Sequence, residues 1–179
     1  FSYASLTILH LDVNSISIGN DQFSGSKSLR NIFIKSNSSI NLGIGCLSKS
    51  AELVSVTLDG KSITIGNGCF SDCSSLTEFI VDNAINVALG KGIFIKCKNL
   101  WTIDIGVANN LTIAEGCFYK SCIENVNFHG QSINIGKECF MNCYTIKKFT
   151  ILSAETVTLE ISAFEGCSNL EIVKFNNIS

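Results

Sequence analysis

Apolar residues recur along this chain in a pattern that repeats about every 23 residues. Residues 63–81 and 133–151 both follow the template I-x-[IL]-G-x-x-[CA]-F-x-x-C-x-x-L-x-x-[IFV]-x-[IVFL] closely. Self-similarity at this period is the signature of stacked repeat architectures, so the sequence predicts a solenoid. The Phe position of the template recurs at intervals of 22 to 24 residues, at Phe23, Leu47, Phe70, Phe94, Phe118, Phe140 and Phe164.

Each repeat contains two short segments in which apolar and polar residues alternate. Residues 100–105 show the first, L-x-x-I-x-I, and residues 16–19 show the second, I-x-I-G. Alternation of this kind predicts strands with one buried face. The intervening G-x-x-C-F-x-x-C is too short for a true helix, and we expect a single turn of 3₁₀ or α conformation. One repeat is a residue short, between Phe118 and Ile123.

A glycine recurs directly after the second alternating segment. This position predicts either a turn that needs positive φ or close contact with the neighbouring coil. The glycines concerned are Gly19, Gly66, Gly90 and Gly136.

Stacking the repeats in register predicts the fold class. We expect a right-handed, leucine-rich-repeat-like coil, mostly β and loop, stabilised by contacts between neighbouring repeats. A parallel β-sheet should line the concave face, and short strands and 3₁₀ turns the convex side. The expected domain is a single array over residues 1–179, with a partial repeat at 1–11 and about seven repeats after it. Its core should contain a continuous aromatic stack of Phe70, Phe94, Phe118 and Phe140.

Composition narrows the classes of partner. The 13 Lys and Arg residues against 15 Asp and Glu give a net charge of −2, which lacks the basic surface that nucleic acids require. No apolar run approaches the roughly 18 residues of a membrane span, so no membrane insertion is expected in this segment. His10 and His129 fall on outward strand positions with no nucleophile nearby, and we expect surface residues there. We therefore predict no enzyme, no catalytic residues, no cofactor and no metal.

Nine cysteines are the chain's oddest feature, together with the absence of proline. Eight of them share two template positions, and we interpret them as buried ladders of small, soft apolar side chains. Disulfides between stacked repeats are an alternative, although parallel side-chain directions disfavour the required torsion. A metal site is the third, but C-x₃-C without histidine is not zinc spacing. The two sets are Cys46, Cys69, Cys117 and Cys139, and Cys73, Cys97, Cys143 and Cys167, with Cys122 displaced by the missing residue.

The run G-x-x-C-F-x-x-C-x-x-L-x-x-I-x-I resembles the BspA-like leucine-rich repeats (the Treponema/BspA type), whose usual form is I-G-x-x-A-F-x-x-C-x-x-L-x-x-I-x-I. The resemblance covers essentially the whole chain, although the family's proline is replaced and its alanine is often cysteine here. The family is found in surface proteins of host-associated bacteria and parasitic protists, and members are implicated in adhesion. The resemblance thus implies an extracellular binding module, because the fold alone hosts many roles.

Function should lie on the outward positions of the first strands, which are the third, fifth and seventh residues of L-x-x-I-x-I-x. Phe33 and Ile80 are expected to be apolar anchors beside an acidic patch, a common signature of an interface. A mixed solvated face is one alternative, and a hard-cation site on Asp59 and Asp82 is another. The predicted binding residues are Phe33, Glu78, Ile80, Asp82, Asp104, Asn127 and Lys148.

Two hypotheses for function follow. The first is a surface adhesion module, on the cell surface or secreted, that binds a host matrix or cell-surface protein. The second is an intracellular scaffold for protein–protein interaction, which the many free thiols favour because extracellular proteins rarely keep them. The open ends of a solenoid also allow end-to-end self-association.

Overall fold

Each repeat contributes two strands, and strands of successive repeats pair in parallel. The structure, a computed structural model, describes residues 5–176. One strand, β11 (Asn125–Ile135), supplies both segments of its repeat without interruption. The other first strands are β1 (Ile8–Val13), β3 (Asn31–Ser36), β5 (Ser55–Asp59), β7 (Glu78–Asp82), β9 (Thr102–Asp104), β12 (Lys148–Ser153) and β14 (Ile172–Phe175). The other second strands are β2 (Ile16–Ile18), β4 (Ser39–Leu42), β6 (Ser62–Ile65), β8 (Asn86–Leu89), β10 (Val107–Ile113) and β13 (Thr156–Leu159).

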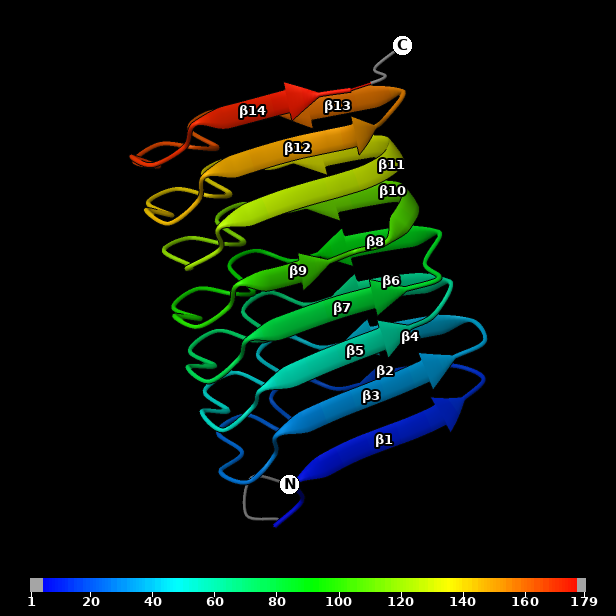
Figure 1. The fold of residues 1–179 in the computed structure, drawn as a ribbon. Coiled ribbons are helices and arrows are strands. Elements are labelled where there is room, and N and C mark those ends of the chain that lie inside the picture. Colours follow the sequence, from blue (N-terminus) through cyan, green and yellow to red (C-terminus); the bar gives the residue numbers. More distant parts are fainter. Residues whose placement is uncertain (1–4, 177–179) are drawn as a thin grey trace.

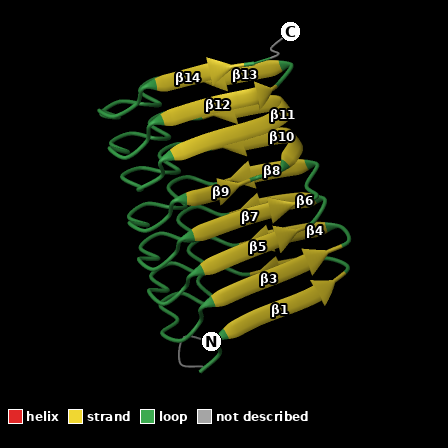
Figure 2. Cartoon of the chain, viewed as in Figure 1, coloured by secondary structure: helices red, strands yellow, loops and turns green. Residues whose placement is uncertain are grey.

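The strands form two parallel layers that rise coil by coil from one end of the chain to the other (Figure 1). A five-stranded sheet has the order β1-β3-β5-β7-β9, and a nine-stranded sheet runs β14-β12-β11-β10-β8-β6-β4-β2, with β13 paired to β11. Strands and loops account for all of the described residues (Figure 2). No helix among them is long and apolar enough to cross a membrane. The predicted class, a leucine-rich-repeat-like solenoid of β-strands and loops, is confirmed.

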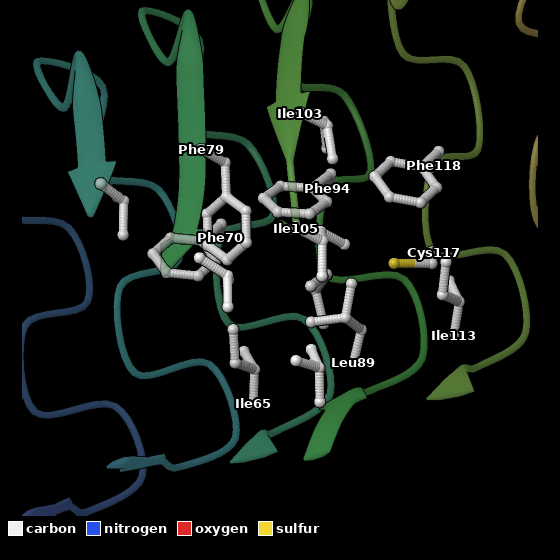
Figure 3. Close-up of a cluster of buried hydrophobic side chains, with 14 of the residues drawn as sticks. Ile65, Phe70, Phe79, Leu89, Phe94, Ile103, Ile105, Ile113, Cys117 and Phe118 are labelled. Atoms are coloured by element: carbon white, nitrogen blue, oxygen red, sulfur yellow. The ribbon is translucent and has the colours of Figure 1, made fainter. Parts of the chain in front are cut away.

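The core lies between the two layers and contains the predicted aromatic stack (Figure 3). Ring centroids of Phe70 and Phe94 are 5.7 Å apart, those of Phe94 and Phe118 5.3 Å, and those of Phe118 and Phe140 5.0 Å. The stack continues to Phe164, 5.4 Å from Phe140. The prediction is therefore confirmed, and the stack runs one coil further than expected.

The turns carrying the stacked rings contain no helix, as their length predicted, and no continuous 3₁₀ segment. They do contain i→i+3 hydrogen bonds, as between the Ser48 amide and the Gly45 carbonyl. However, left-handed residues stand two positions before and two after the Phe position, and they prevent a continuous 3₁₀ turn. These are Asp21 and Gly25, Gly45 and Lys49, Gly68 and Asp72, Gly92 and Lys96, Gly116 and Lys120, Glu138 and Asn142, and Ser162 and Gly166.

Of the two purposes considered for the glycine after the second strand, the structure supports close packing at Gly66, Gly90 and Gly136. None of Gly19, Gly66, Gly90 and Gly136 has a positive φ. A Cβ on Gly66 would lie 2.6 Å from backbone atoms of the preceding coil. The glycine column therefore lets backbones stack directly on one another.

Candidate functional site

Parallel pairing brings the predicted outward residues into rows on the five-stranded sheet. The fifth-position row runs through His10, Phe33, Thr57, Ile80 and Asp104, each paired with the next. We call the outward side of β1, β3, β5, β7 and β9 the first-strand face. The acidic side chains lie on three adjacent strands of it, as expected from the repeat.

Exposure differs among the predicted binding residues. Phe33 is 43% exposed, and Asp82 and Asp104 are exposed as well. Glu78 and Ile80 are half-buried between them, so Ile80 presents less apolar surface than an outward position suggested.

Asn127 and Lys148 do not belong to the five-stranded sheet. They lie on β11 and β12, which pair with each other but not with β9. Thr150, the next residue of the fifth-position row, is only 1% exposed although its position predicts exposure. A gap between Asp104 and Asn127 therefore interrupts the predicted surface, which is not one continuous row.

The division is a break in the hydrogen-bond ladder between β9 and β11. At the junction before it, the amides of Trp101 and Thr102 both donate to the Thr77 carbonyl. At the junction after it, the amides of Lys147 and Lys148 both donate to Glu124. Within the described part of the chain, no such bonds join the Trp101 carbonyl to the next coil.

The missing residue after Phe118 accompanies a change of register at the same place. β10 begins early and pairs Val107 with His129 and Ala108 with Gly130, one residue out of step with the template. A Cβ on Gly130 would collide with the Ala108 carbonyl oxygen, so a glycine is needed where β11 passes. Figure 1 shows β11 running from the first layer into the second while β9 stops short.

The break leaves a cleft of about 490 Å³ on the same side as the first-strand face. We call it the β9–β11 cleft. Its most exposed large side chains are Trp101, 54% exposed, and Val107, 70% exposed. The full lining is Trp101, Thr102, Ile103, Asp104, Gly106, Val107, Asn125, Asn127 and His129. His129, expected on the open surface, therefore lies half-buried in the cleft wall.

A smaller hollow of about 210 Å³ surrounds Phe33. The His10 ring lies beside the Phe33 ring, with centroids 6.1 Å apart. Asp59 and Asp82, paired in register, line the hollow, and Asp59 accepts a hydrogen bond from the Asn83 amide at 2.9 Å. Within residues 5–176, no three His, Cys, Asp or Glu side chains are grouped so that they could hold a metal ion.

Sequence reasoning missed a groove of about 630 Å³ over the turns. Lys91 and Glu115 line it and form an ion pair at 2.8 Å. The hydrogen bond between them raises the pKa of Lys91 and lowers that of Glu115. The available signal was the residue after the Phe position, where Ile95 and Tyr119 replace the serine of earlier repeats.

Seven of the nine cysteines are buried, as the ladder interpretation predicts, and Cys122 and Cys167 are half-buried. The Cys97 thiol donates to the Phe70 carbonyl at 3.1 Å, and Cys143 to the Phe118 carbonyl at 2.9 Å. Ser50, in the same column, donates to the Phe23 carbonyl at 3.1 Å. This column is therefore a row of small hydrogen-bond donors between coils, and not only an apolar ladder.

Burial also controls the reactivity of these thiols. It raises the pKa of Cys143 to about 11 and that of Cys73 to about 12, because the thiolate would lose its hydration. Only the thiolate reacts as a nucleophile, so buried thiols with raised pKa are inert at neutral pH.

We expect Cys122 to react fastest with a chromogenic thiol reagent in the native protein, then the half-buried Cys167, whose pKa is raised by its partial burial, and the seven buried thiols slowly. All nine thiols should react after denaturation without reductant. Cys122→Ser should remove one of the fast thiols and leave the slow ones unchanged. Fast reaction of most thiols in the native state, or no reaction in the unfolded state, would contradict the buried, reduced arrangement.

A comparison of the sequence with models of known protein families identifies the same repeat. The profile of the BspA type leucine rich repeat region matches in six copies, over residues 1–112 and 87–179. The chain belongs to the BspA-type leucine-rich repeat family. No curated protein and no solved structure shows significant similarity to it. BspA-type arrays are repeat modules of protein interaction, typically part of surface or secreted proteins and typically non-enzymatic.

Proposed function

We propose that this BspA-type chain, a single repeat array over the sequence 1–179, is an adhesion module on the cell surface or secreted. Its ligand is a host matrix or cell-surface protein, which it binds through the first-strand face. The observation that carries the proposal is Phe33, a large apolar ring 43% exposed in a hollow bordered by charged residues. Apolar anchors within a polar rim are the usual arrangement of a binding hot spot.

Charged and apolar residues of this face are expected to contribute differently to binding. Asp82 and Asp104 are exposed, and carboxylates at a rim mainly affect the association rate and specificity. Phe33 and Ile80 supply the apolar area that a partner can bury, and such anchors hold most of the binding energy. Lys148 lies beyond the β9–β11 cleft and contributes, with Asn127, only to a partner large enough to cross it.

The experiment is a pull-down with the intact array against host matrix and cell-surface proteins. Capture that is lost on changing Phe33 supports adhesion through this face. Capture only of intracellular proteins would favour the alternative, an intracellular scaffold, which nine free cysteines support because oxidising compartments seldom preserve them. End-to-end self-association between arrays is a separate proposal.

With a partner in hand, Phe33→Ala combined with Ile80→Ala should weaken binding by about 2 kcal/mol or more. The reason is the loss of both apolar anchors, and calorimetry or biolayer interferometry measures it. Ile44→Ala is the matched control, since Ile44 is 53% exposed but lies on the turn side.

The charged pair gives a second readout of the same face. Asp82→Asn combined with Asp104→Asn should reduce the salt dependence of the association rate while leaving the fold intact. Unchanged affinity and salt dependence in both double variants would move the binding site to the turns or to the ends of the array.

A further inference from the structure

We infer that the β9–β11 cleft binds a neutral saccharide, with a pyranose ring against the Trp101 indole and its hydroxyl groups on Asp104, Asn125 and Asn127. This ligand differs from the protein partner proposed above, although Asp104 and Asn127 belong to both surfaces. The cleft lies where β9 and β11 do not pair, and its lining includes Trp101, the only tryptophan in the chain. A cavity and an exposed aromatic side chain therefore occur at one place.

Trp101 provides the apolar surface for such a ligand. It is 54% exposed, although a tryptophan usually buries most of its ring. Residues at the same template position in the neighbouring coils are Thr77 and Glu124, so the repeat itself does not require an aromatic side chain there. A pyranose ring has a face of C–H groups that packs on an indole and an edge of hydroxyls that needs polar partners.

The polar partners are present and uncommitted. Within residues 5–176, the side chains of Asn125, Asn127 and His129 form no hydrogen bonds with other residues. Asparagines elsewhere on the solenoid are often tied to the next coil, as Asn31 is to Ser55 at 2.8 Å. Each free amide offers an acceptor oxygen and two donor hydrogens, which suits vicinal hydroxyl groups.

Asp104 is already oriented for this role. One of its carboxylate oxygens accepts a hydrogen bond from the Gly106 amide at 2.9 Å, which fixes the side chain at the cleft. The other oxygen is left to accept from a ligand hydroxyl. A positioned carboxylate beside neutral amides favours a hydroxyl donor and repels phosphate or carboxylate groups.

Size and charge select the ligand class. The cleft volume of about 490 Å³ lies within the roughly 300–1,000 Å³ of small-ligand sites. Its lining contains no Lys or Arg, so an anionic ligand has no counter-charge. A peptide adding as a strand would find only the three residues of β9 on one side, too short an edge for strand addition.

Because Trp101 is the only tryptophan in the chain and lines the cleft, its fluorescence reports binding at this place. Glucose, galactose, mannose and N-acetylglucosamine, with their short oligomers, are titrated into the intact array while Trp101 emission is recorded. We expect a saturable shift of that emission with at least one neutral saccharide. Saturation-transfer NMR, which does not need the reporter, should show affinity falling by about tenfold or more in Trp101→Ala and about fivefold in Asn127→Ala.

Tyr144→Ala is the matched control because Tyr144 is equally exposed, at 54%, but lies outside the cleft. It should keep the wild-type affinity, and circular dichroism should show all three variants folded. The inference is overturned if no saccharide in the panel saturates either signal, or if Tyr144→Ala loses as much as Trp101→Ala. Saturation by an aromatic peptide alone would also overturn it. Because free sugars are the probes, the result does not depend on the protein-binding proposal.

Discussion

Phe118→Ala is expected to lower the free energy of unfolding by about 3–5 kcal/mol, the usual range for emptying a core phenylalanine. The Phe118 side chain is fully buried, and it stacks on Phe94 at 5.3 Å on one side and on Phe140 at 5.0 Å on the other. Removing the ring therefore strips contacts from two neighbouring coils at once. A solenoid has little means of closing such a cavity, because both coils are held by their own backbone ladders.

Urea denaturation followed by circular dichroism measures the change. Leu47→Ala, at the same template position but nearer one end of the array, should cost less. Lys61→Ala, on an exposed side chain, sets the baseline for a surface change. If Phe118→Ala shifted the unfolding midpoint no more than Lys61→Ala, the rings would not be stabilising the stack.

The repeat made much of this architecture predictable. When coils stack in register, each template position meets the same position of the next coil, so one correct alignment fixes every row. Phe33 was therefore placed beside His10 and Thr57, and Phe94 beside Phe70 and Phe118, as the structure confirms.

The β9–β11 cleft shows where that reasoning stops. The missing residue after Phe118 was visible in the sequence, but it does not by itself predict the break, because β5 and β7 have the same spacing as β9 and β11 and still pair. The structure keeps the second strands aligned, pairing Leu111 with Ile133, and lets the first strands separate. The local sequence does not show whether the first or the second strands will keep their pairing, because the answer depends on how both neighbouring coils pack. The cleft residues Trp101 and His129 were missed as a site for that reason.

The cysteine column was interpreted too simply for a different reason. Cys73, Cys97 and Cys143 were taken as soft apolar side chains, yet each donates a hydrogen bond to a carbonyl of the preceding coil. Serine at Ser50 makes the same contact, and serine at this position in three repeats was the overlooked signal. A column occupied only by Cys and Ser provides a small hydrogen-bond donor in each coil, and hydrophobicity alone does not describe it.

Left-handed turn residues were equally hard to locate. Glycine occupies many of these positions, such as Gly68, but Asp72 and Lys96 adopt positive φ as well. Non-glycine residues can occupy that region at a modest cost, which the ladder of hydrogen bonds between successive turns offsets. The Asp72 amide, for example, donates to the Ile95 carbonyl at 2.9 Å. A glycine search therefore finds only part of the pattern.

The glycines that directly follow the second strands give the second large expected effect on stability. Gly66→Ala should lower the free energy of unfolding by about 3 kcal/mol, at the upper end of the cost of overpacking. A Cβ there would lie 2.6 Å from the Gly43 carbonyl carbon and 2.6 Å from the Ile44 nitrogen. Both atoms belong to backbone, and the Gly66 amide is bonded to the Leu42 carbonyl at 2.7 Å, so the coils cannot separate without breaking that ladder.

Gly19→Ala is the matched control, since Gly19 holds the same template position in the first complete repeat. A Cβ on Gly19 would meet only the flexible Gln22 side chain, at 3.6 Å or more, and no backbone. Its φ is not positive, so alanine should be neutral or stabilising by about 0.4–1 kcal/mol through the unfolded chain. Ala114 and Glu160 occupy the same template position in later coils, so a Cβ is accommodated at some places in this column. Equal unfolding midpoints for the Gly66 and Gly19 variants would show that coil spacing adapts freely, and the close-packing account of the glycine column would then be wrong.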